Sequence, residues 1–331
     1  MARSLEQQQD RKTPEAATAA KGSEAVVHAG HDGAFDPSTR LPVAKAYKMF
    51  VGGAFVRSES GRYFQTRGAA EGSADPGVVN VPRGSRKDAR DAVLAAKNAG
   101  DGWGARTAYN RGQILYRLAE VMESRRAELR ASLERASLPA DEAAREVERA
   151  IDRAVYYAGF CDKYQSLVAS LNPVAGPHFG FSVPEPMGVV AVVAPERPAL
   201  LGLVSTVLPI VAGANTCVAL AGAFDPRTAV VWCECLATSD LPGGVVNVLT
   251  GQASEMAPHL AKHREVAAMD VWSADADLRA AVEREGSGNV KRVRTHDAAG
   301  AVDFFASDAG QGLGYIERFL ETKTVWHPVG V

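Results

Sequence analysis

The side chains best suited to attack a carbonyl carbon are the thiols of Cys161, Cys217, Cys233 and Cys235. A cysteine becomes a strong nucleophile when a neighbouring cation or histidine holds it as a thiolate. Neither Cys217 nor Cys233 is followed by such a histidine, and the spacing of the four matches no CxxC metal or redox signature. Cys233 and Cys235 lie two positions apart on an expected helix and point about 200° away from each other. We therefore interpret all four as free, buried thiols.

A glycine run, Gly310-Gln311-Gly312-Leu313-Gly314, has the GxGxG spacing of some phosphate-binding loops. Such a loop works when it follows a strand and opens a crossover helix, and neither pattern flanks this run. We expect it to form the turn into a last helix and strand. The pair Gly243-Gly244 is expected to form a turn between a helix and a strand.

The composition allows one large buried core or two smaller ones, because 46% of the 331 residues are hydrophobic. A net charge of −2 gives no electrostatic footprint for nucleic acid or for an anionic membrane, so neither is expected as a partner. The chain has no uninterrupted run of about 18 apolar residues, and its N-terminus lacks the apolar core of a signal peptide. We expect a soluble, cytoplasmic protein.

The first 44 residues are polar, rich in Ala, Gln and Gly, and contain a single aromatic residue, Phe35. Such a segment cannot bury enough apolar surface to offset the entropy of ordering, so we expect residues 1–44 to form a disordered tail. Order is expected from residues 49–56, where two β-prone runs flank Gly52-Gly53 as in a hairpin.

Three helices are expected after this hairpin, over residues 88–99, 110–137 and 141–164. In the second, apolar residues recur every three or four positions, which is typical of a helix with one buried face. The third begins with an Asp-Glu pair, which suits the positive end of a helix dipole. Residues 176–186 alternate in character and are bracketed by prolines, as an exposed or edge strand would be.

The pattern then changes to apolar strands that alternate with helices. Strands are expected at 189–193, 216–220 and 245–249, with helices at 199–212 and 227–236. Continuously apolar strands in this arrangement are typical of a parallel sheet covered on both faces. The sequence therefore predicts an α/β fold with a doubly wound, Rossmann-like sheet.

Several segments carry a resemblance to a known family. They are residues 50–56, 156–159, 186–195, 212–218 and 240–251. Together they resemble the aldehyde dehydrogenase superfamily over about residues 45–300, and the likeness resumes at Gly312. Residues 172–179 and 181–186 look most like the second, non-catalytic repeat of the two-repeat members of family 16.

This resemblance implies a division of the chain. Residues 45–306 would form an aldehyde dehydrogenase-type coenzyme domain, with an oligomerisation hairpin at 168–188. Residues 307–331 would form the C-terminal oligomerisation tail. Almost nothing lies between Lys291 and this tail, so the segment that holds the catalytic cysteine in active relatives is missing.

The other catalytic positions of the family have also changed. Arg197 stands where active relatives have the asparagine of the oxyanion hole, and it is too long to place one amide donor about 2.9 Å from an oxyanion. His296 takes the place of the general-base glutamate. A histidine can act as a base near neutral pH, but it would have no nucleophile to serve, so we interpret His296 as a surface-loop residue. We therefore expect a chain with no catalytic residues for aldehyde oxidation.

The cofactor positions point the same way. The lysine and glutamate that hold the adenosine ribose in relatives fall on Leu220 and Ala223 here, and the phosphate-binding segment carries the carboxylates of Asp275 and Asp277. Those carboxylates would repel a phosphate. The family positions still available to a nucleotide are Pro195, Arg197, Gly251 and Ser273. We therefore expect no cofactor, or NAD or NADP bound only weakly.

Three functions follow from the resemblance. The preferred one is a catalytically inactive subunit that associates with a full-length, active aldehyde dehydrogenase, because the family's C-terminal strand, near residues 323–326 here, extends a sheet of a neighbouring subunit. A homo-oligomer is also possible, and so is a remnant whose tail folds back on its own core. The alternative functions are an NAD(P)-dependent aldehyde dehydrogenase and a nucleotide-binding module without catalysis.

Overall fold

A seven-stranded sheet forms the centre of the computed structural model, which describes residues 45–66, 78–297 and 302–329. The predicted disordered tail at 1–44 lies outside these residues. The strand order is β11-β10-β7-β8-β9-β1-β2, and neighbours from β11 to β9 are parallel. The parallel strands are β7 (Val189–Val193), β8 (Thr216–Leu220), β9 (Val246–Leu249), β10 (Val266–Trp272) and β11 (Arg292–His296). The predicted doubly wound α/β fold is confirmed.

The predicted hairpin at 49–56 closes one edge of this sheet. It consists of β1 (Met49–Val51) and β2 (Ala54–Val56), which are antiparallel, and β1 also pairs antiparallel with β9. Gly52 and Gly53 make the turn with φ of 62° and 85°, a backbone conformation that favours glycine.

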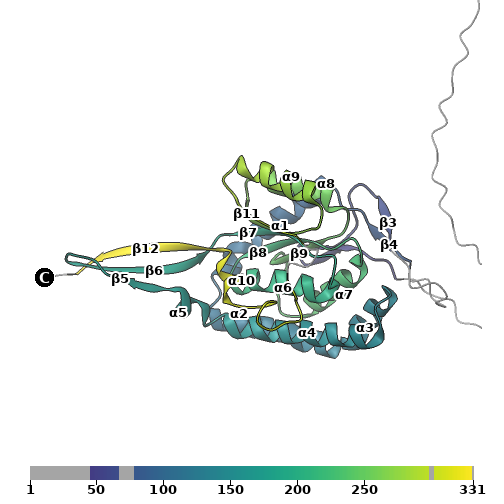
Figure 1. Ribbon diagram of the computed structural model, residues 1–331, viewed down its shortest axis with the longest axis horizontal. Helices are drawn as coiled ribbons and strands as arrows, with labels where there is room; N and C mark the ends of the chain where they lie inside the picture. Colours follow the sequence, from purple (N-terminus) through teal and green to yellow (C-terminus); the bar gives the residue numbers. More distant parts are fainter. Residues whose placement is uncertain (1–44, 67–77, 298–301, 330–331) are drawn as a thin grey trace, which may run out of the picture. The chain divides into compact units, whose positions relative to one another are not determined.

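Helices cover both faces of the sheet, as continuously buried strands require. Along β7, Val189, Ala191 and Val193 belong to one apolar cluster and Val190 and Val192 to another, so successive side chains point to opposite faces. Figure 1 shows α1 (Arg86–Gly104), α8 (Ala253–Lys262) and α9 (Ala276–Ser287) on one side of the sheet. It shows α6 (Ala199–Ala212) and α7 (Pro226–Thr238) on the other.

An outer layer of helices packs against α6 and α7. It contains α2 (Ala108–Ser124), α3 (Arg126–Arg135) and α4 (Ala140–Phe160). The single helix predicted over 110–137 is wrong, because Arg125 leaves the helical conformation at φ −106° and ψ 15° and separates α2 from α3. The Arg125 guanidinium lies 2.6 Å from Glu128 and 2.5 Å from Glu234 of α7. The break thus depends in part on a tertiary ion pair.

A three-stranded sheet projects from this body as an arm, in yellow and teal in Figure 1. The arm consists of β5 (Ser170–Asn172), β6 (His178–Pro186) and β12 (Leu320–Pro328), and it follows two short helices, α5 (Tyr164–Val168) and α10 (Leu313–Glu317). β12 pairs with β6 over nine positions, from Leu320 opposite Pro186 to Pro328 opposite His178. The predicted edge strand at 176–186 is therefore the central strand of the arm, with β5 on its other side.

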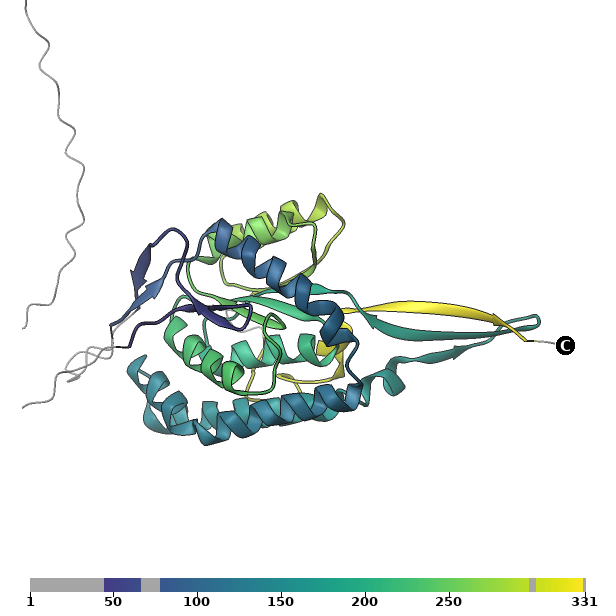
Figure 2. The same cartoon turned by 180° about the vertical axis from the view of Figure 1, so that it is seen from behind.

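Polar side chains of the body hold the backbone at the base of the arm. Arg292 donates to the carbonyl oxygens of Arg318 at 2.8 Å and Leu320 at 3.0 Å, and Asn215 donates to that of Phe319 at 2.9 Å. Arg153 of α4 donates to the carbonyl oxygen of Phe304 at 2.8 Å and to that of Gly310. These bonds fix the backbone at Phe304, Gly310 and residues 318–320 to the body. Figure 2 shows the arm and the body from behind.

The remaining strands, β3 (Tyr63–Gln65) and β4 (Asn80–Pro82), form a separate antiparallel pair. Among the described helices, none combines the length and the apolar character needed to cross a bilayer.

Candidate functional site

The carboxyl ends of the parallel strands meet at one edge of the sheet, where ligands of such folds usually bind. The loops that follow β7 and β8 are closed on each other by the carboxylate of Glu196. Glu196 accepts hydrogen bonds from the amides of Ala223 at 3.1 Å and Phe224 at 2.6 Å. Gly222 leaves room for this closure, since a Cβ there would make a tight contact of 3.1 Å with the Pro195 carbonyl oxygen. The amides of Ala223 and Phe224 therefore already bind the carboxylate of Glu196.

Two of the helix N-termini at this edge, those of α6 and α7, also have carboxylate partners. Glu146 of α4 accepts from the amides of Leu200 at 2.7 Å and Leu201 at 3.1 Å, in the first turn of α6. Burial raises the pKa of the Glu146 carboxyl group, and these two bonds act in the opposite direction. Asp225 caps α7 by accepting from the amide of Thr228 at 3.3 Å. The amide donors at the starts of α6 and α7 that could stabilise a phosphate or an oxyanion are thus occupied.

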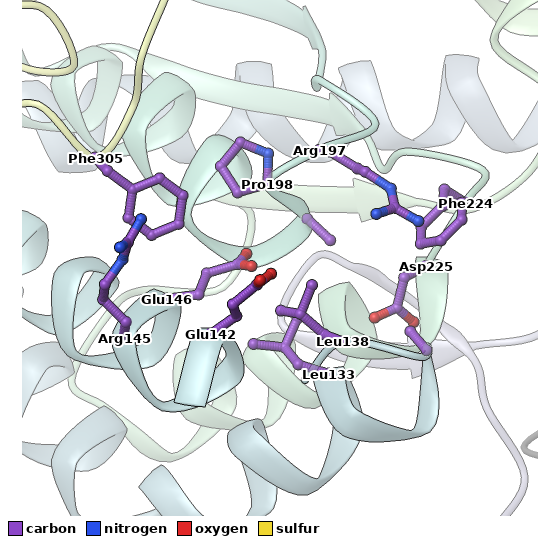
Figure 3. A pocket seen from close by; sticks show the side chains of 12 residues that line it. Leu133, Leu138, Glu142, Arg145, Glu146, Arg197, Pro198, Phe224, Asp225 and Phe305 are labelled. Atoms are coloured by element: carbon purple, nitrogen blue, oxygen red, sulfur yellow. The ribbon is translucent and has the colours of Figure 1, made fainter. Parts of the chain in front are cut away.

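A cavity of about 410 Å³ opens beside these helix starts (Figure 3). Arg197 lines it, with its guanidinium 3.9 Å from the centre of the Phe224 ring. On the opposite side Arg145 lies 4.4 Å from the centre of the Phe305 ring, and the carboxylates of Glu142 and Glu146 lie between the two arginines. The cavity therefore carries both signs of charge, which gives it no strong preference for an anion.

The four predicted cofactor positions lie at the carboxyl ends of β7, β9 and β10, but their surroundings differ. Arg197 lines the cavity, whereas Pro195 packs on α6, where a Cβ at Gly202 would lie 2.5 Å from its ring. Gly251 has φ of 141° and packs against the backbone of Gly84. The Ser273 hydroxyl accepts from the amide of Asp275 at 3.1 Å. Three of the four positions thus serve local packing or turn structure.

The interpretation of His296 as a surface-loop residue is wrong. His296 is the last residue of β11, opposite Trp272 in the strand register, and the two rings stack 3.8 Å apart at 8°. Its Nε2 lies 2.9 Å from the carboxylate of Asp270, which also accepts from the Trp272 indole at 2.7 Å. The pairing of β10 with β11 brings His296 to Asp270 and Trp272. Because this pairing cannot be read from the sequence, only the Asp-x-Trp alternation was visible there. The His296 side chain thus contacts Asp270 and Trp272, and none of its described interactions involves a cysteine.

The predicted free, buried state of all four cysteines is confirmed. Burial raises the pKa of Cys161 and Cys235 to about 12 each, and it also raises the pKa of Cys217 and Cys233. A thiol protonated at neutral pH is neither a nucleophile nor a metal ligand. Within the part of the chain that the structure describes, the acidic, histidine and cysteine side chains also form no group of three suited to hold a metal ion.

We therefore expect a thiol reagent such as dithionitrobenzoate to leave the native protein unmodified over minutes. After unfolding in guanidinium, all four cysteines should react. The release of the coloured thiolate measures both states. Rapid modification of any one cysteine in the native protein would contradict the burial and reveal a candidate nucleophile.

Asp225 and Asp270 could have been found from the sequence, whereas Glu196 could not. Asp225 precedes a proline and a helix, which is a usual N-cap signature. Asp270 lies two residues before Trp272, so both side chains are on one face of a strand. Glu196 lies in a loop and gives no local signal, because its partners come from the loop after a different strand.

The order of the strands, the coenzyme-type sheet and the arm together define a class of protein. The aldehyde dehydrogenase family model matches residues 55–296, and the chain belongs to this family. The resemblance stated above is thereby confirmed for the superfamily. The likeness to one repeat of family 16 stays a prediction.

Individual relatives match along part of their length. Cytosolic 10-formyltetrahydrofolate dehydrogenase of Mus musculus is 31% identical over 233 residues, which cover 69% of this chain and 25% of that protein. Omega-crystallin of Enteroctopus dofleini is 28% identical and is covered to 51%. The solved structure of a putative aldehyde dehydrogenase from Burkholderia cenocepacia matches with a TM-score of 0.70 at 25% identity, over 75% of this chain and 50% of that one. The chain thus spans a quarter to a half of these relatives.

Proposed function

We propose that this chain is a non-catalytic member of the aldehyde dehydrogenase family that associates with a full-length, active aldehyde dehydrogenase and supports it. The observation that carries the proposal is the arm. Among the described strands β12 pairs with β6 alone, so its other edge has no strand partner from Glu321 to Pro328. An open edge strand of this length is a template for pairing with another chain.

The side chains of the arm support association. Trp326 on β12 is 63% exposed and Leu171 on β5 is 72% exposed, while Phe179 is half exposed. The strand register places Leu171 and Phe179 on one face of the arm and Trp326 on the other, so both faces expose a large apolar side chain, which is typical of an interaction surface. Asn215 and Arg292 hydrogen-bond the backbone of Phe319 and Leu320 at the base of the arm. Because the base is already fixed, less conformational entropy is lost when a partner binds.

The experiment that tests this proposal is gentle purification of the tagged full chain from its own cells. We expect a full-length aldehyde dehydrogenase to elute with it in a fixed ratio, as measured by native mass spectrometry. A single species containing only this chain, as monomer or homo-oligomer, while active aldehyde dehydrogenases of the same cells elute elsewhere, would refute the proposal.

Charged substitutions on the arm should weaken the association with the partner enzyme. A Leu171→Glu, Trp326→Glu double variant places two carboxylates on the sheet and is expected to weaken binding of the partner by at least about 30-fold. Tyr109→Glu serves as the matched control, because Tyr109 is 67% exposed on α2, outside the three strands of the arm. Equal loss in the control, or none in the arm variant, would place the contact elsewhere.

The enzymatic alternative requires a nucleotide, and the carboxylates at the sheet edge disfavour one. Each charge-assisted hydrogen bond that a phosphate fails to make costs roughly 1.5–3 kcal/mol. We therefore expect dissociation constants for NAD and NADP weaker than about 10 μM in calorimetry. Tighter binding would favour an NAD(P)-dependent enzyme or a nucleotide-binding module over an accessory subunit.

A further inference from the structure

A basic groove lies on the outer surface of the helix layer, between α1 and α8, which run side by side. Its volume is about 450 Å³. Its floor is apolar and includes Ala89 and Leu260. Six basic residues line it, Arg86, Lys87, Arg90, His259, Lys262 and His263, and no acidic residue is among the lining residues that the structure describes.

The helical spacing brings these residues together. Arg86 and Arg90 are four positions apart on α1 and so lie on one helix face, while His259 lies in the last turn of α8 and His263 directly follows that helix. Beyond the groove the seam between the helices carries ion pairs, between Arg83 and Glu255 at one end and between Lys97 and Glu265 at 2.8 Å at the other. The middle of the seam is lined by cations instead.

Some of the cations have acidic partners at the rim. Lys87 lies 2.5 Å from Glu59, Arg90 lies 2.7 Å from Asp91, and Lys262 lies 3.1 Å from Glu285. Arg86 forms no hydrogen bond or ion pair with any described residue. At pH 7 Arg86 is therefore the cation of the groove whose five donors are open to a ligand.

The cations of the groove oppose one another, which indicates that folding stability does not explain them. The pKa of His259 is lowered, first by burial and then by the positive charges of Arg86 and Lys262. Arg86 and Lys87 also lie in the first turn of α1, where the helix dipole disfavours positive charge. An anionic ligand would relieve both effects.

We propose that the α1–α8 groove binds a small molecule that carries a diphosphate or longer phosphate chain. Arginine binds phosphate oxygens through two parallel hydrogen bonds, and lysine adds a point charge. The volume falls in the usual range for small-ligand sites, and Ala89 with Leu260 can contact an apolar group attached to the phosphates. The groove is formed by the outer faces of two helices, so it is separate from the sheet edge that carries Glu196, and the proposal is independent of the function proposed above.

Calorimetric titration of the full chain with sodium tripolyphosphate, in low salt, tests the proposal. We expect one site with a dissociation constant near about 100 μM, weakening as salt is added. An Arg86→Gln, Lys262→Gln double variant should bind at least about tenfold more weakly. Arg117→Gln, Arg130→Gln is the matched control, since both arginines are exposed on α2 and α3 and pair with neighbouring glutamates.

Circular dichroism of the variants shows whether each is folded, so loss of binding in a folded groove variant is interpretable. Parallel titrations with ADP and pyrophosphate identify the source, because tighter binding of ADP indicates a nucleotide and equal binding an inorganic or other phosphate ester. Three results would overturn the proposal. They are no saturable heat up to about 5 mM tripolyphosphate, equal weakening in the control variant, and binding of an oligonucleotide duplex without binding of the small anions.

Discussion

Purified protein supplied with NAD or NADP and a panel of aldehydes is expected to produce no reduced coenzyme, with turnover below about 10⁻³ s⁻¹. Oxidation of an aldehyde by this family's route needs a thiolate, and burial raises the pKa of all four thiols above the ordinary cysteine range. Absorbance at the wavelength of the reduced nicotinamide measures the rate. The same assay with a full-length aldehyde dehydrogenase shows that the conditions support turnover.

A positive result would have a clear diagnosis. Turnover that disappears when Cys161 or another single cysteine becomes serine would assign a nucleophile and contradict the accessory role. Turnover that survives every such substitution would indicate a contaminating enzyme, and a second purification step would remove it. The absence of turnover alone does not establish a partner, which is why the copurification experiment is separate.

An Arg153→Ala substitution is expected to lower the free energy of unfolding by about 3–5 kcal/mol. The Arg153 side chain is 3% exposed and donates to the Ser205 hydroxyl at 2.6 Å as well as to the carbonyl oxygens of Phe304 and Gly310. Its loss would leave these acceptors buried and unpaired next to a cavity. Chemical denaturation followed by circular dichroism measures the effect.

Two further variants make this result specific. Arg153→Lys keeps a donor and should cost about half as much, since an ammonium can reach fewer of the acceptors. Arg149→Ala, one helical turn away on α4, removes an exposed arginine 3.5 Å from Asp152 and should change stability by less than about 0.5 kcal/mol. If Arg153→Ala were as mild as this control, the segment from Phe304 to Gly310 would not depend on the buried guanidinium.

Three of the five parallel strands, β7, β8 and β9, were predicted from the sequence because burial on both faces leaves a local signal, whereas β10 and β11 were not predicted. The apolar run at Val189–Val193 and the helix at Ala199–Ala212 have the predicted bounds. The break at Arg125 was not predictable in the same way, since the periodicity continues across it and the partner, Glu234, lies on α7. Likewise Pro184 and Pro186 suggested an edge strand, but β5 pairs only with Gly180 to Ser182, so β6 has an open side beside those prolines.

The site followed a similar division. Family positions such as Arg197 could be identified by alignment of motifs, and Arg197 does line a cavity. The side chains around these positions could not be identified in this way. Glu146 reaches the first turn of α6 from α4, and Glu196 reaches a loop across the sheet edge. The basic groove was also missed, since an overall charge of −2 does not reveal six basic residues gathered between two helices.

The burial of every cysteine makes this protein suitable for optical studies of its arm. A Trp326→Cys substitution would add one accessible sulfur at a residue that is 63% exposed. A maleimide dye would then attach at that position with little background from Cys161, Cys217, Cys233 or Cys235. Energy transfer from this dye to one on another polypeptide would report, in real time, when the two chains meet.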